Sequence, residues 1–531
     1  MRLTRLRALN QLLEIRIKDL RFLQPEVSEL LFSATGHKVN DEAVTHLQQE
    51  IEGWAVGLRL VSLGMRHSKT PSEFLLSLRG GIPQIQEYLL IEVLSGLPDA
   101  VRDCMLKISV LNRFCADLAE FACNAGKNAL AQTDASGSDT VLQLRTQNLF
   151  VIPLDLQEYW FRYHHLFQEL LQRELSASMA EDEIAEIHMR ACLWFETHGY
   201  IDEAIEHALK AGDPLFAARI VERHCYQEIE ADRNYVVGRW LASIPKDITR
   251  QSLALVLAHT WVAMFGNQLE QVAALTGDAE ALLKAEDTHT GLAGEVDFFR
   301  GYLLFWEGVT GESMRLLERA QQSIDSHKNM IIAEADLHLA LARYVDGQGK
   351  FALQALNEQI AKFGGVQLSR RLAALAFVRM LSADLPGFVV DAQRMRAFDK
   401  KMRNPLVDSW SFYFEGCADI HWFNLEKALI GFSMVVEEPH IVDVRPAIDA
   451  FAGLALTQQF LGQPDKATET IEKLRVFVSE SGDPAYQIVV NSCQARINLL
   501  QGNPESAIQW AGSFHDTPGL FDLFLWLEVP A

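Results

Sequence analysis

Apolar residues recur at helical spacing along most of the chain, and beyond about residue 180 no strand-like alternation remains. Glycines punctuate this part. An alanine follows such a glycine by five residues at Gly199/Ala204, Gly212/Ala217, Gly347/Ala352, Gly462/Ala467 and Gly502/Ala507. Glycine ends a helix without a Cβ penalty, and a small residue in the next helix lets the two helices approach. The pattern predicts paired helices.

The predicted turns between paired helices are evenly spaced from residue 266 to residue 502, in steps of 38 to 42 residues. They fall near Gly266, Gly308, Gly347, Leu385, Phe423, Gly462 and Gly502. Leu385 and Phe423 are placed by spacing alone, because neither is a glycine. Each pair leaves an apolar face open until the next pair stacks on it. We therefore predict a right-handed, tetratricopeptide-like superhelix of about seven helix pairs.

A different pattern covers residues 86–178. It predicts helices over 90–97, from Pro98-Asp99 onward, over 116–123 and over 141–147, strands over 150–152 and 159–161, and a final helix. The second helix should bury Val101, Met105 and Ile108, which share one face. Three helices followed by a hairpin are the parts of a winged helix.

The first 85 residues open with a strand-like run over 12–17 and continue in helices. The clearest helix is predicted from about Val39 to Met65. Its apolar face would carry Trp54, Leu58, Val61 and Met65. Gly53 and Gly57 interrupt this stretch, and they indicate close packing against a neighbour.

The whole chain is predicted to be mainly α. At 531 residues it is too long for one hydrophobic core. The predicted domains are 36–85, a helical linker; 86–178, the winged helix; and 179–531, the helical repeats, with residues 1–35 as a separate N-terminal segment. The formal charge of −22 opposes contact with phosphate backbones, so direct nucleic-acid binding is not expected.

The seven cysteines are scattered and never at C-x-x-C spacing. They are predicted to be reduced thiols of a cytoplasmic protein. The most apolar stretch, 253–265, is shorter than a membrane span, and residues 1–7 lack the apolar run of a signal peptide. Neither a membrane nor an exported location is expected.

Three segments resemble the MalT-like, large ATP-binding LuxR regulators, which belong to the signal-transducing ATPases with numerous domains. They are Glu52–Leu58, Tyr88–Leu118 and Asn148–Leu171. The resemblance implies a P-loop domain before these segments, an effector-binding superhelix, and a helix-turn-helix domain after it. By the same resemblance, residues 1–35 are expected to be the remnant of the end of the nucleotide-binding domain. It also implies that effector and ATP together favour self-association and promoter activation.

The sequence departs from this plan at both ends. No G-x-x-x-x-G-K-[ST] motif occurs, because Gly126-Lys127 and Gly349-Lys350 have Phe121 and Tyr344 where the first glycine must stand. No basic helix-turn-helix follows the repeats. The chain is therefore expected to hold no cofactor by itself, and ATP or ADP only together with a separate ATPase domain.

The resemblance also gives candidate site residues. A histidine that begins the last winged-helix helix contacts ADP phosphates in these ATPases, which points to His164 and His165, with Arg162 beside them. Arg21 could reach the same phosphates from the N-terminal side. The alternatives are that the histidines cap a helix and bond to the hairpin backbone, and that the arginines are surface residues in salt bridges. No metal site is predicted.

Aromatic residues recur along the superhelix. They include Trp240, Trp261, Trp306, Trp422 and Trp510, with Phe298, Phe299, Tyr302 and Phe412. They could line a groove for a sugar or another effector. At helical spacing, solenoid core is the favoured interpretation.

Catalytic signatures such as H-E-x-x-H and G-x-S-x-G do not occur, so no enzyme activity is predicted. The favoured function is a sensor and scaffold segment of a LuxR/MalT-type transcriptional regulator, with an effector or protein partner bound on its superhelix. Self-association is left open. The alternatives are a free-standing tetratricopeptide-like adaptor and, with less support, a degraded reading frame.

Overall fold

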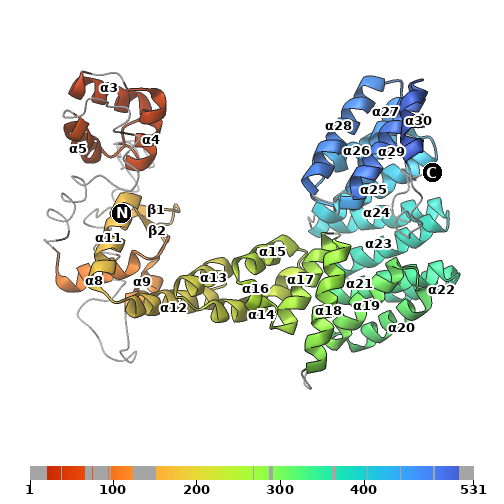
Figure 1. The fold of residues 1–531 in the computed structure, drawn as a ribbon, viewed down its shortest axis with the longest axis horizontal. Helices are drawn as coiled ribbons and strands as arrows, with labels where there is room; N and C mark the ends of the chain where they lie inside the picture. Colours follow the sequence, from red (N-terminus) through yellow and green to blue (C-terminus); the bar gives the residue numbers. More distant parts are fainter. Residues whose placement is uncertain are drawn as a thin grey trace, which may run out of the picture. The chain divides into compact units, whose positions relative to one another are not determined.

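The computed structural model is built almost entirely of helices (Figure 1). It describes residues 21–36, 39–65, 75, 94, 97–123, 141, 151–266, 268–285, 291–361, 366–402, 405–442, 444–481 and 485–513. Backbone contacts divide the chain into two compact units, Met1–Ala217 (unit 1) and Ala218–Ala531 (unit 2). The prediction of a mainly α protein is confirmed.

Unit 1 begins with α3 Gln24–Thr35, α4 Asp41–Ile51 and α5 Ala55–Met65. The prediction of one helix over 39–65 was wrong, because Glu52 and Gly53 turn left-handed, with φ of 50° and 71°. The Phe22 amide donates a 2.9 Å hydrogen bond to the Gly53 carbonyl. A Cβ on Gly53 would lie 2.4 Å from the Phe22 carbonyl oxygen, so the predicted close packing at this glycine is confirmed. Leu58, Val61 and Met65 are buried, as predicted.

The winged-helix part of unit 1 comprises α8 Asp99–Ile108, α9 Ala116–Cys123, β1 Val151–Pro153, β2 Phe161–Tyr163 and α11 His165–Ser178. The strands pair antiparallel, with Ile152 opposite Arg162. Val101, Met105 and Ile108 are buried, as predicted. The predicted strand over 12–17 and helices over 90–97 and 141–147 lie outside the described residues, apart from Leu94, Leu97 and Val141.

The second strand begins two residues later than predicted, at Phe161 instead of Tyr159. Asp155 explains the shift. Its carboxylate accepts backbone N–H hydrogen bonds from Gln157, Tyr159 and Trp160, at 2.9, 3.1 and 2.7 Å. An aspartate that bonds to the amides following it holds the chain in a turn, so residues 155–160 connect the strands.

Helices α12 Glu181–Thr197 and α13 Ile201–Lys210 complete unit 1, and α14 Pro214–Glu230 contains the boundary between the units. The hairpin is joined to this helix pair by Arg113, which forms an ion pair with Glu203. The Arg113 guanidinium also lies 4.4 Å from the Trp160 ring centroid and 4.9 Å from that of Tyr200. The compact unit therefore continues past residue 178, where the sequence placed a domain boundary.

Two cysteines differ from the sequence prediction. Cys104 on α8 and Cys123 at the end of α9 form a disulfide, with their Cα atoms 5.3 Å apart. The prediction of seven reduced thiols was wrong for this pair, because helix packing brings together two residues that are 19 positions apart. Cys115, Cys192, Cys225, Cys417 and Cys493 are free thiols, all buried.

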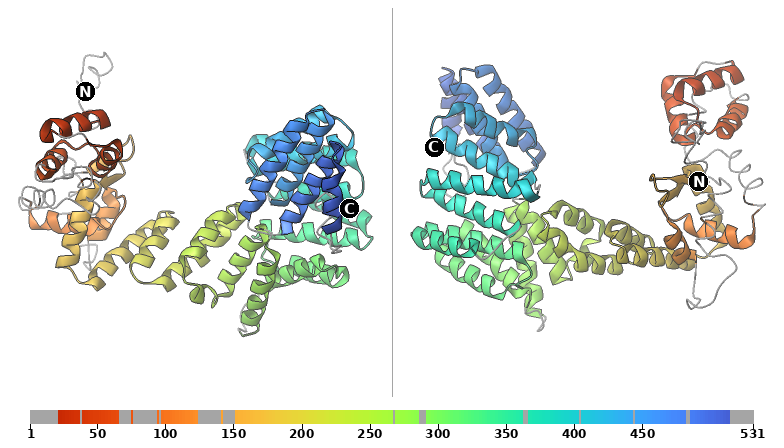
Figure 2. Two further views of the ribbon diagram at one scale, coloured as in Figure 1. Left: turned by 45° about the horizontal axis from the view of Figure 1, so that its top comes forward. Right: turned by 180° about the vertical axis from the view of Figure 1, so that it is seen from behind.

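Unit 2 continues with α15 Asn234–Ser243 and the short α16 Lys246–Thr249. Helix pairs follow, as α17 Leu253–Phe265 with α18 Leu269–Ala285, α19 Ala293–Trp306 with α20 Thr310–Ser323, α21 Asn329–Val345 with α22 Gly349–Ile360, α23 Val366–Leu381 with α24 Leu385–Met402, α25 Pro405–His421 with α26 Leu425–Glu437, α27 Val444–Phe460 with α28 Pro464–Ser481, and α29 Ala485–Leu500 with α30 Pro504–Ser513. Successive pairs pack side by side (Figure 2). Within the described residues, the prediction of about seven pairs is confirmed.

Most of these pairs turn at a residue with left-handed backbone. The glycines among them are Gly308, Gly347, Gly462 and Gly502, with φ between 72° and 84°. Phe423 has the same conformation, at φ 61°, as its spacing predicted. Leu385 was the wrong choice: it begins α24, and Ala383 holds the left-handed position, at φ 56°. Gly266 ends α17 as predicted, but with φ of −79°.

Most of the small residues after the turns are buried as expected, although Ala507 is only half-buried. Ala352 and Ala467 follow Gly347 and Gly462 by five residues, and both are fully buried. A larger side chain there would push the paired helices apart. Among the described residues, no helix is both long enough and apolar enough to cross a membrane.

The turn at Ala383 offers a test of this backbone constraint. We expect Ala383→Gly to stabilise unit 2 by about 1 kcal/mol, because glycine adopts a left-handed φ without strain. The reverse change, Gly462→Ala, should destabilise it by about the same amount, since open space around Gly462 leaves only the backbone cost. Amide hydrogen exchange at the two turns measures both effects. Equal exchange in Ala383→Gly and wild type would contradict the expectation.

Candidate functional site

The four predicted site residues of unit 1 meet at the break between α4 and α5. Arg21 Nη1 lies 3.0 Å from Glu52 Oε2, and Arg162 Nη2 lies 3.0 Å from Glu52 Oε1. His165 Nδ1 lies 3.4 Å from the same Oε1. Residues that are more than 140 positions apart therefore share one carboxylate. We call Glu52, Arg21, Arg162, His164 and His165 the Glu52 cluster.

His164 joins the cluster through the backbone. It is the N-cap residue of α11, but its side chain makes no capping bond. Its Nε2 atom lies 3.2 Å from the Ile51 carbonyl oxygen, and its ring stacks on His165 with the centroids 4.8 Å apart. The predicted alternative, a bond to the hairpin backbone, was therefore wrong for this side chain, because its partner is the last residue of α4.

The protonation states in the cluster follow from burial and charge. Burial lowers the pKa of His164 to about 4, and the attraction of Glu52 only partly opposes this shift. Burial would raise the pKa of the Glu52 carboxyl, but the positive charges around it prevail, and its pKa is lowered. His164 is neutral at pH 7, so the charges of Arg162 and Arg21 are the ones that keep Glu52 ionised.

The cluster also has the ligand types of a metal site. Ligand atoms of Glu52, His164 and His165 lie within 4.8 Å of one another. Both carboxylate oxygens, however, already pair with guanidinium groups, and a metal cation would have to displace Arg21 and Arg162. Two arginines and two imidazoles around a single carboxylate suit an anion better than a cation. Glu52 itself was not predicted as a site residue, because nothing in its local sequence points toward residues 162–165.

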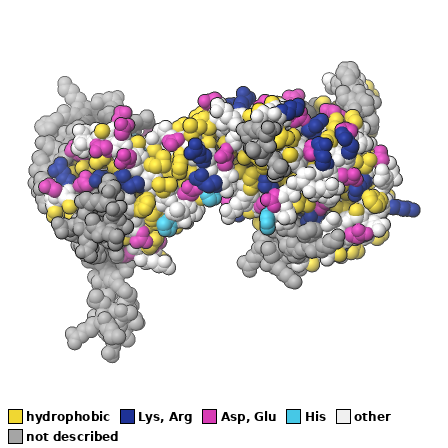
Figure 3. Space-filling view, turned by 90° about the horizontal axis from the view of Figure 1, so that it is seen from below, with side chains coloured by type: hydrophobic (Ala, Val, Ile, Leu, Met, Phe, Trp, Pro, Cys, Tyr) yellow, Lys and Arg dark blue, Asp and Glu magenta, His cyan; other side chains and the backbone are white. Residues whose placement is uncertain are grey.

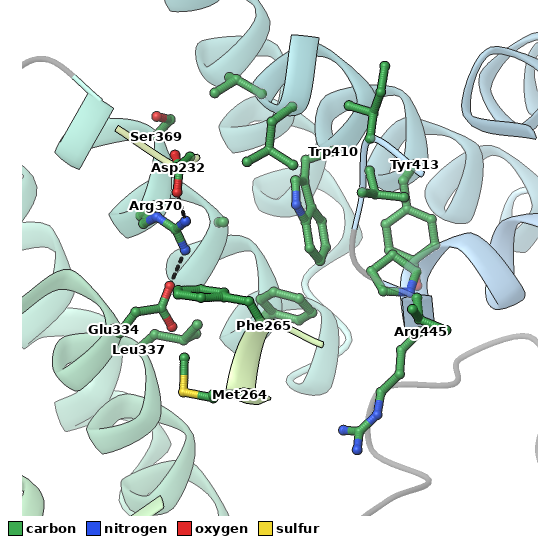
Figure 4. A pocket seen from close by; sticks show the side chains of 18 of the residues that line it. Asp232, Met264, Phe265, Glu334, Leu337, Ser369, Arg370, Trp410, Tyr413 and Arg445 are labelled. Carbon is green, nitrogen blue, oxygen red and sulfur yellow. Dashed lines mark hydrogen bonds and ion pairs between the residues drawn. The ribbon is translucent and has the colours of Figure 1, made fainter. Parts of the chain in front are cut away.

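A second candidate site is a cavity of about 410 Å³ in unit 2 (Figure 4). The first helices of six consecutive pairs line it, namely α17, α19, α21, α23, α25 and α27. The start of α15, the segment between α26 and α27, and single residues of α24 and α28 complete the wall. A volume of this size is within the range of pockets for small organic molecules.

One wall of the cavity carries an ion-paired triad. Arg370 on α23 pairs through Nη1 with Glu334 on α21 and through Nη2 with Asp232, which precedes α15. Figure 4 shows Arg370 between the two carboxylates. The Arg370 guanidinium also lies 5.3 Å from the ring centroid of Phe265. The triad joins α21 and α23 to the turn that precedes α15.

A second arginine, Arg445 at the start of α27, also lines the cavity and is 5% exposed. Its guanidinium lies 4.4 Å from the ring centroid of Trp306. Two further polar groups of the wall are neutral at pH 7: burial raises the pKa of Tyr302 to about 12 and lowers that of His338.

The aromatic residues divide between core and cavity. The core interpretation is confirmed for Trp240, Trp261, Phe298 and Phe299, which are buried away from the cavity. Trp306 and Tyr302 line the cavity instead. Trp422 is 43% exposed, so the core interpretation was wrong there. The repeat pattern alone could not separate these positions, since all lie on helices of the same kind.

Figure 3 adds a view of the surface. On the face that it shows, Lys and Arg are interspersed with Asp and Glu over the described residues, without a continuous basic patch.

Comparison with known proteins agrees with this architecture. Residues 90–183 match the MalT winged helix domain. The serine/threonine-protein kinase PknK of Mycobacterium tuberculosis is 31% identical over 303 residues, which cover 56% of this chain and 26% of that protein. The HTH-type transcriptional regulator MalT of Klebsiella pneumoniae is 26% identical over 313 residues, covering 59% of this chain and 34% of that protein. The chain thus spans only about a quarter to a third of these relatives.

A solved structure has a similar fold. It is the crystal structure of a signal transduction ATPase with numerous domains, with a tetratricopeptide repeat sensor, from Pyrococcus horikoshii. Its TM-score is 0.52 at 13% identity, and the alignment covers 93% of this chain and 73% of that chain. Together these findings confirm the resemblance to MalT that the sequence indicated: the chain is similar to MalT in sequence and has a MalT-type winged helix followed by a tetratricopeptide-like superhelix. Its fold is similar to that of the Pyrococcus horikoshii protein.

Proposed function

We propose that the chain is the sensor and scaffold segment of a MalT-type transcriptional regulator, and that an effector binds in the cavity of unit 2. The observation that carries this proposal is that six consecutive helix pairs contribute to one cavity. A ligand there contacts all six pairs at once. Because it binds best to one arrangement of them, it shifts the population of superhelix conformations toward that arrangement.

We further propose that the Glu52 cluster senses an anion, with Glu52 occupying the place of a nucleotide phosphate. The supporting observation is that four basic side chains surround one carboxylate that belongs to the chain itself. A phosphate that replaced Glu52 would gain the paired N–H donors of Arg21 and Arg162. Glu52 would then lose its ion pair with Arg162 on β2, so the turn between α4 and α5 would separate from the hairpin. In this way nucleotide binding would change the packing of unit 1.

The cavity proposal predicts a ligand-dependent stabilisation that a cavity-filling change removes. Ala373 lines the cavity, and Ala373→Phe should fill it. At a ligand concentration of about 100 Kd, an effector stabilises the wild type by about 2.7 kcal/mol. Thermal-shift assays with a panel of small organic acids, sugars and nucleosides measure this ligand-dependent stabilisation.

The matched control is Ala274→Phe, which adds the same side chain at an exposed position of α18. Wild type and Ala274→Phe should respond to the same compound, and Ala373→Phe to none. An equal response of Ala373→Phe, or a wild type that responds to nothing, would contradict the proposal.

If the Glu52 cluster binds anions, removing the negative charge of Glu52 should raise its affinity for phosphate. Glu52→Gln should bind inorganic phosphate and Mg-ADP roughly tenfold more tightly than the wild type, because the competing carboxylate is removed while the basic groups remain. Calorimetric titration measures both affinities. Glu181→Gln, an exposed change at the start of α12, is the control. Unchanged affinity in Glu52→Gln would show that the cluster is a structural ion-pair network only.

The same cluster should make unit 1 sensitive to acid. The pKa of His164 falls from 6.5 in the unfolded chain to about 4 in the fold, so the unfolded state binds the proton more readily. Stability is therefore complete above pH 6.5 and is lost as the pH falls toward 4, by about 3 kcal/mol from this residue. His188 and His207, with pKa values lowered by burial to about 4 and about 3, act in the same direction.

Hydrogen exchange of α4 and α11 amides at pH 7 and pH 5 reports this loss. His164→Gln should reduce the pH dependence, because an amide can still bond to the Ile51 carbonyl but takes up no proton. His327→Gln, an exposed change, should leave it as it is. The expectation is wrong if wild type and His164→Gln respond equally to acid.

A further inference from the structure

We propose that the Cys104–Cys123 disulfide is a redox-responsive site, which small thiols open by exchange at Cys123 and thereby loosen the winged helix from α12. The bond joins α8 to the last residue of α9. The inference is independent of the cavity in unit 2 and of the Glu52 cluster. It depends on three features: the segment that the bond encloses, the exposure of each cysteine, and the anchor that α12 provides for the end of α9.

The disulfide closes a short covalent loop around α9. Residues 104–123 contain the second half of α8, a turn and the whole of α9, which has only eight residues. A helix of this length is not stable by itself, so α9 depends on its contacts through Leu118, Ala119 and Ala122, which are buried. A covalent bond at its end removes many of the open conformations of the segment. Once the bond is broken, noncovalent contacts alone hold the last turn of α9.

The two bonded cysteines differ in exposure. Cys104 is 5% exposed, whereas Cys123 is partly exposed at the end of its helix. Exchange begins when a thiolate attacks one sulfur of a disulfide, so attack is expected at Cys123. The new bond forms to the Cys123 sulfur, the bond to Cys104 breaks, and the Cys104 thiolate leaves and takes up a proton. A second small thiol then attacks the mixed disulfide. Two small thiols are thus oxidised to one disulfide while the protein disulfide is reduced to two cysteines.

The free cysteines are less suited to such a reaction. All of them are buried. Burial raises the pKa of the Cys225 thiol to about 12 and raises that of Cys417 well above its usual range. The thiolate is the reactive form, so a buried thiol with a raised pKa exchanges slowly. A change in the surrounding thiols therefore acts first on the pair Cys104 and Cys123.

The end of α9 is also anchored to α12. Carbonyl groups in the last turn of a helix have no hydrogen-bond partner within that helix. The Ala122 carbonyl instead accepts hydrogen bonds from Nε and Nη2 of Arg190, at 3.2 and 3.0 Å. The Arg190 side chain is 19% exposed, so losing this acceptor leaves N–H donors in a partly buried place. Opening the disulfide loosens the residue next to Ala122 and thereby weakens the contact between the winged helix and α12.

The first test uses the unmodified full chain. It is equilibrated in buffers with different ratios of reduced to oxidised glutathione, alkylation with mass spectrometry identifies the free thiols, and amide hydrogen exchange is followed in α9 and α12. In reducing buffer we expect Cys104 and Cys123 to become alkylated while the protein stays folded. Exchange in the last turn of α9 should become faster by about 10- to 100-fold, with a smaller increase around Arg190. Reduction only after unfolding, or equal exchange of α9 in both states, would overturn the inference.

Single-cysteine variants test the direction of attack. Cys104→Ser leaves a partly exposed thiol at Cys123, which should form a mixed disulfide with oxidised glutathione. Cys123→Ser leaves the buried thiol of Cys104, which should react at least about tenfold more slowly. Cys115→Ala changes a buried free thiol of the same unit and is the matched control, with the full redox response of the wild type. Faster reaction at Cys104 than at Cys123 contradicts the proposed route.

A change at Arg190 tests the connection to α12. In Arg190→Gln, reduction should still accelerate exchange in α9, but exchange in α12 should be equal in the oxidised and reduced protein. Arg102→Gln, an exposed change on α8, is the control and should keep the response of both helices. A redox response of α12 that persists in Arg190→Gln would show that the disulfide does not act through this arginine.

Discussion

The burial of one helix pair by the next is the constraint on which unit 2 depends. A single pair cannot cover its own apolar face, so each pair is stable only against a neighbour. The stack stays in register because the chain reverses between the two helices within a few residues, with left-handed backbone at most of these turns. Fully buried alanines such as Ala352 and Ala467 keep the helices close. The repeat length of the chain is thus a consequence of packing geometry.

The stack creates an interior that no isolated pair would have. Because the first helix of each pair faces the same side, residues from six pairs surround one cavity. Charged groups can be buried there only because partners arrive from other helices, as Arg370 does between Asp232 and Glu334. The cavity is therefore a property of the assembled superhelix, and a change in the angle between pairs changes its shape. The proposed sensor function requires such a coupling between helix packing and cavity shape.

In unit 1 the corresponding constraint is electrostatic. The break at Glu52 and Gly53 brings a carboxylate to the hairpin and to the start of α11, where two arginines and two histidines gather around it. Neutral His164 and ionised Glu52 are both results of this packing, since burial disfavours the imidazolium and the arginines favour the carboxylate. The same groups that hold the segments together are the ones that we propose bind an anion.

The sequence by itself determined the features that depend on local periodicity and on glycine. The helix pairs, the turns at Gly308, Gly347, Gly462 and Gly502, the bounds of α9 and the buried face of α8 all follow from spacing and from backbone preferences. The pattern of residues 86–178 also predicted the winged helix, and the family resemblance directed attention to Arg21, Arg162, His164 and His165. The left-handed turn at Ala383 was not predicted, because alanine gives no local signal for it. The start of the second strand at Phe161 was not predicted either, because it depends on the hydrogen bonds that Asp155 accepts.

Only the tertiary structure decided that Glu52 is the centre of one site, that Cys104 meets Cys123, and that Trp306 faces a cavity while Trp261 is core. The physical reason is the same in each case: these roles are set by distances between segments far apart in the chain, and periodicity within one segment carries no information about such distances.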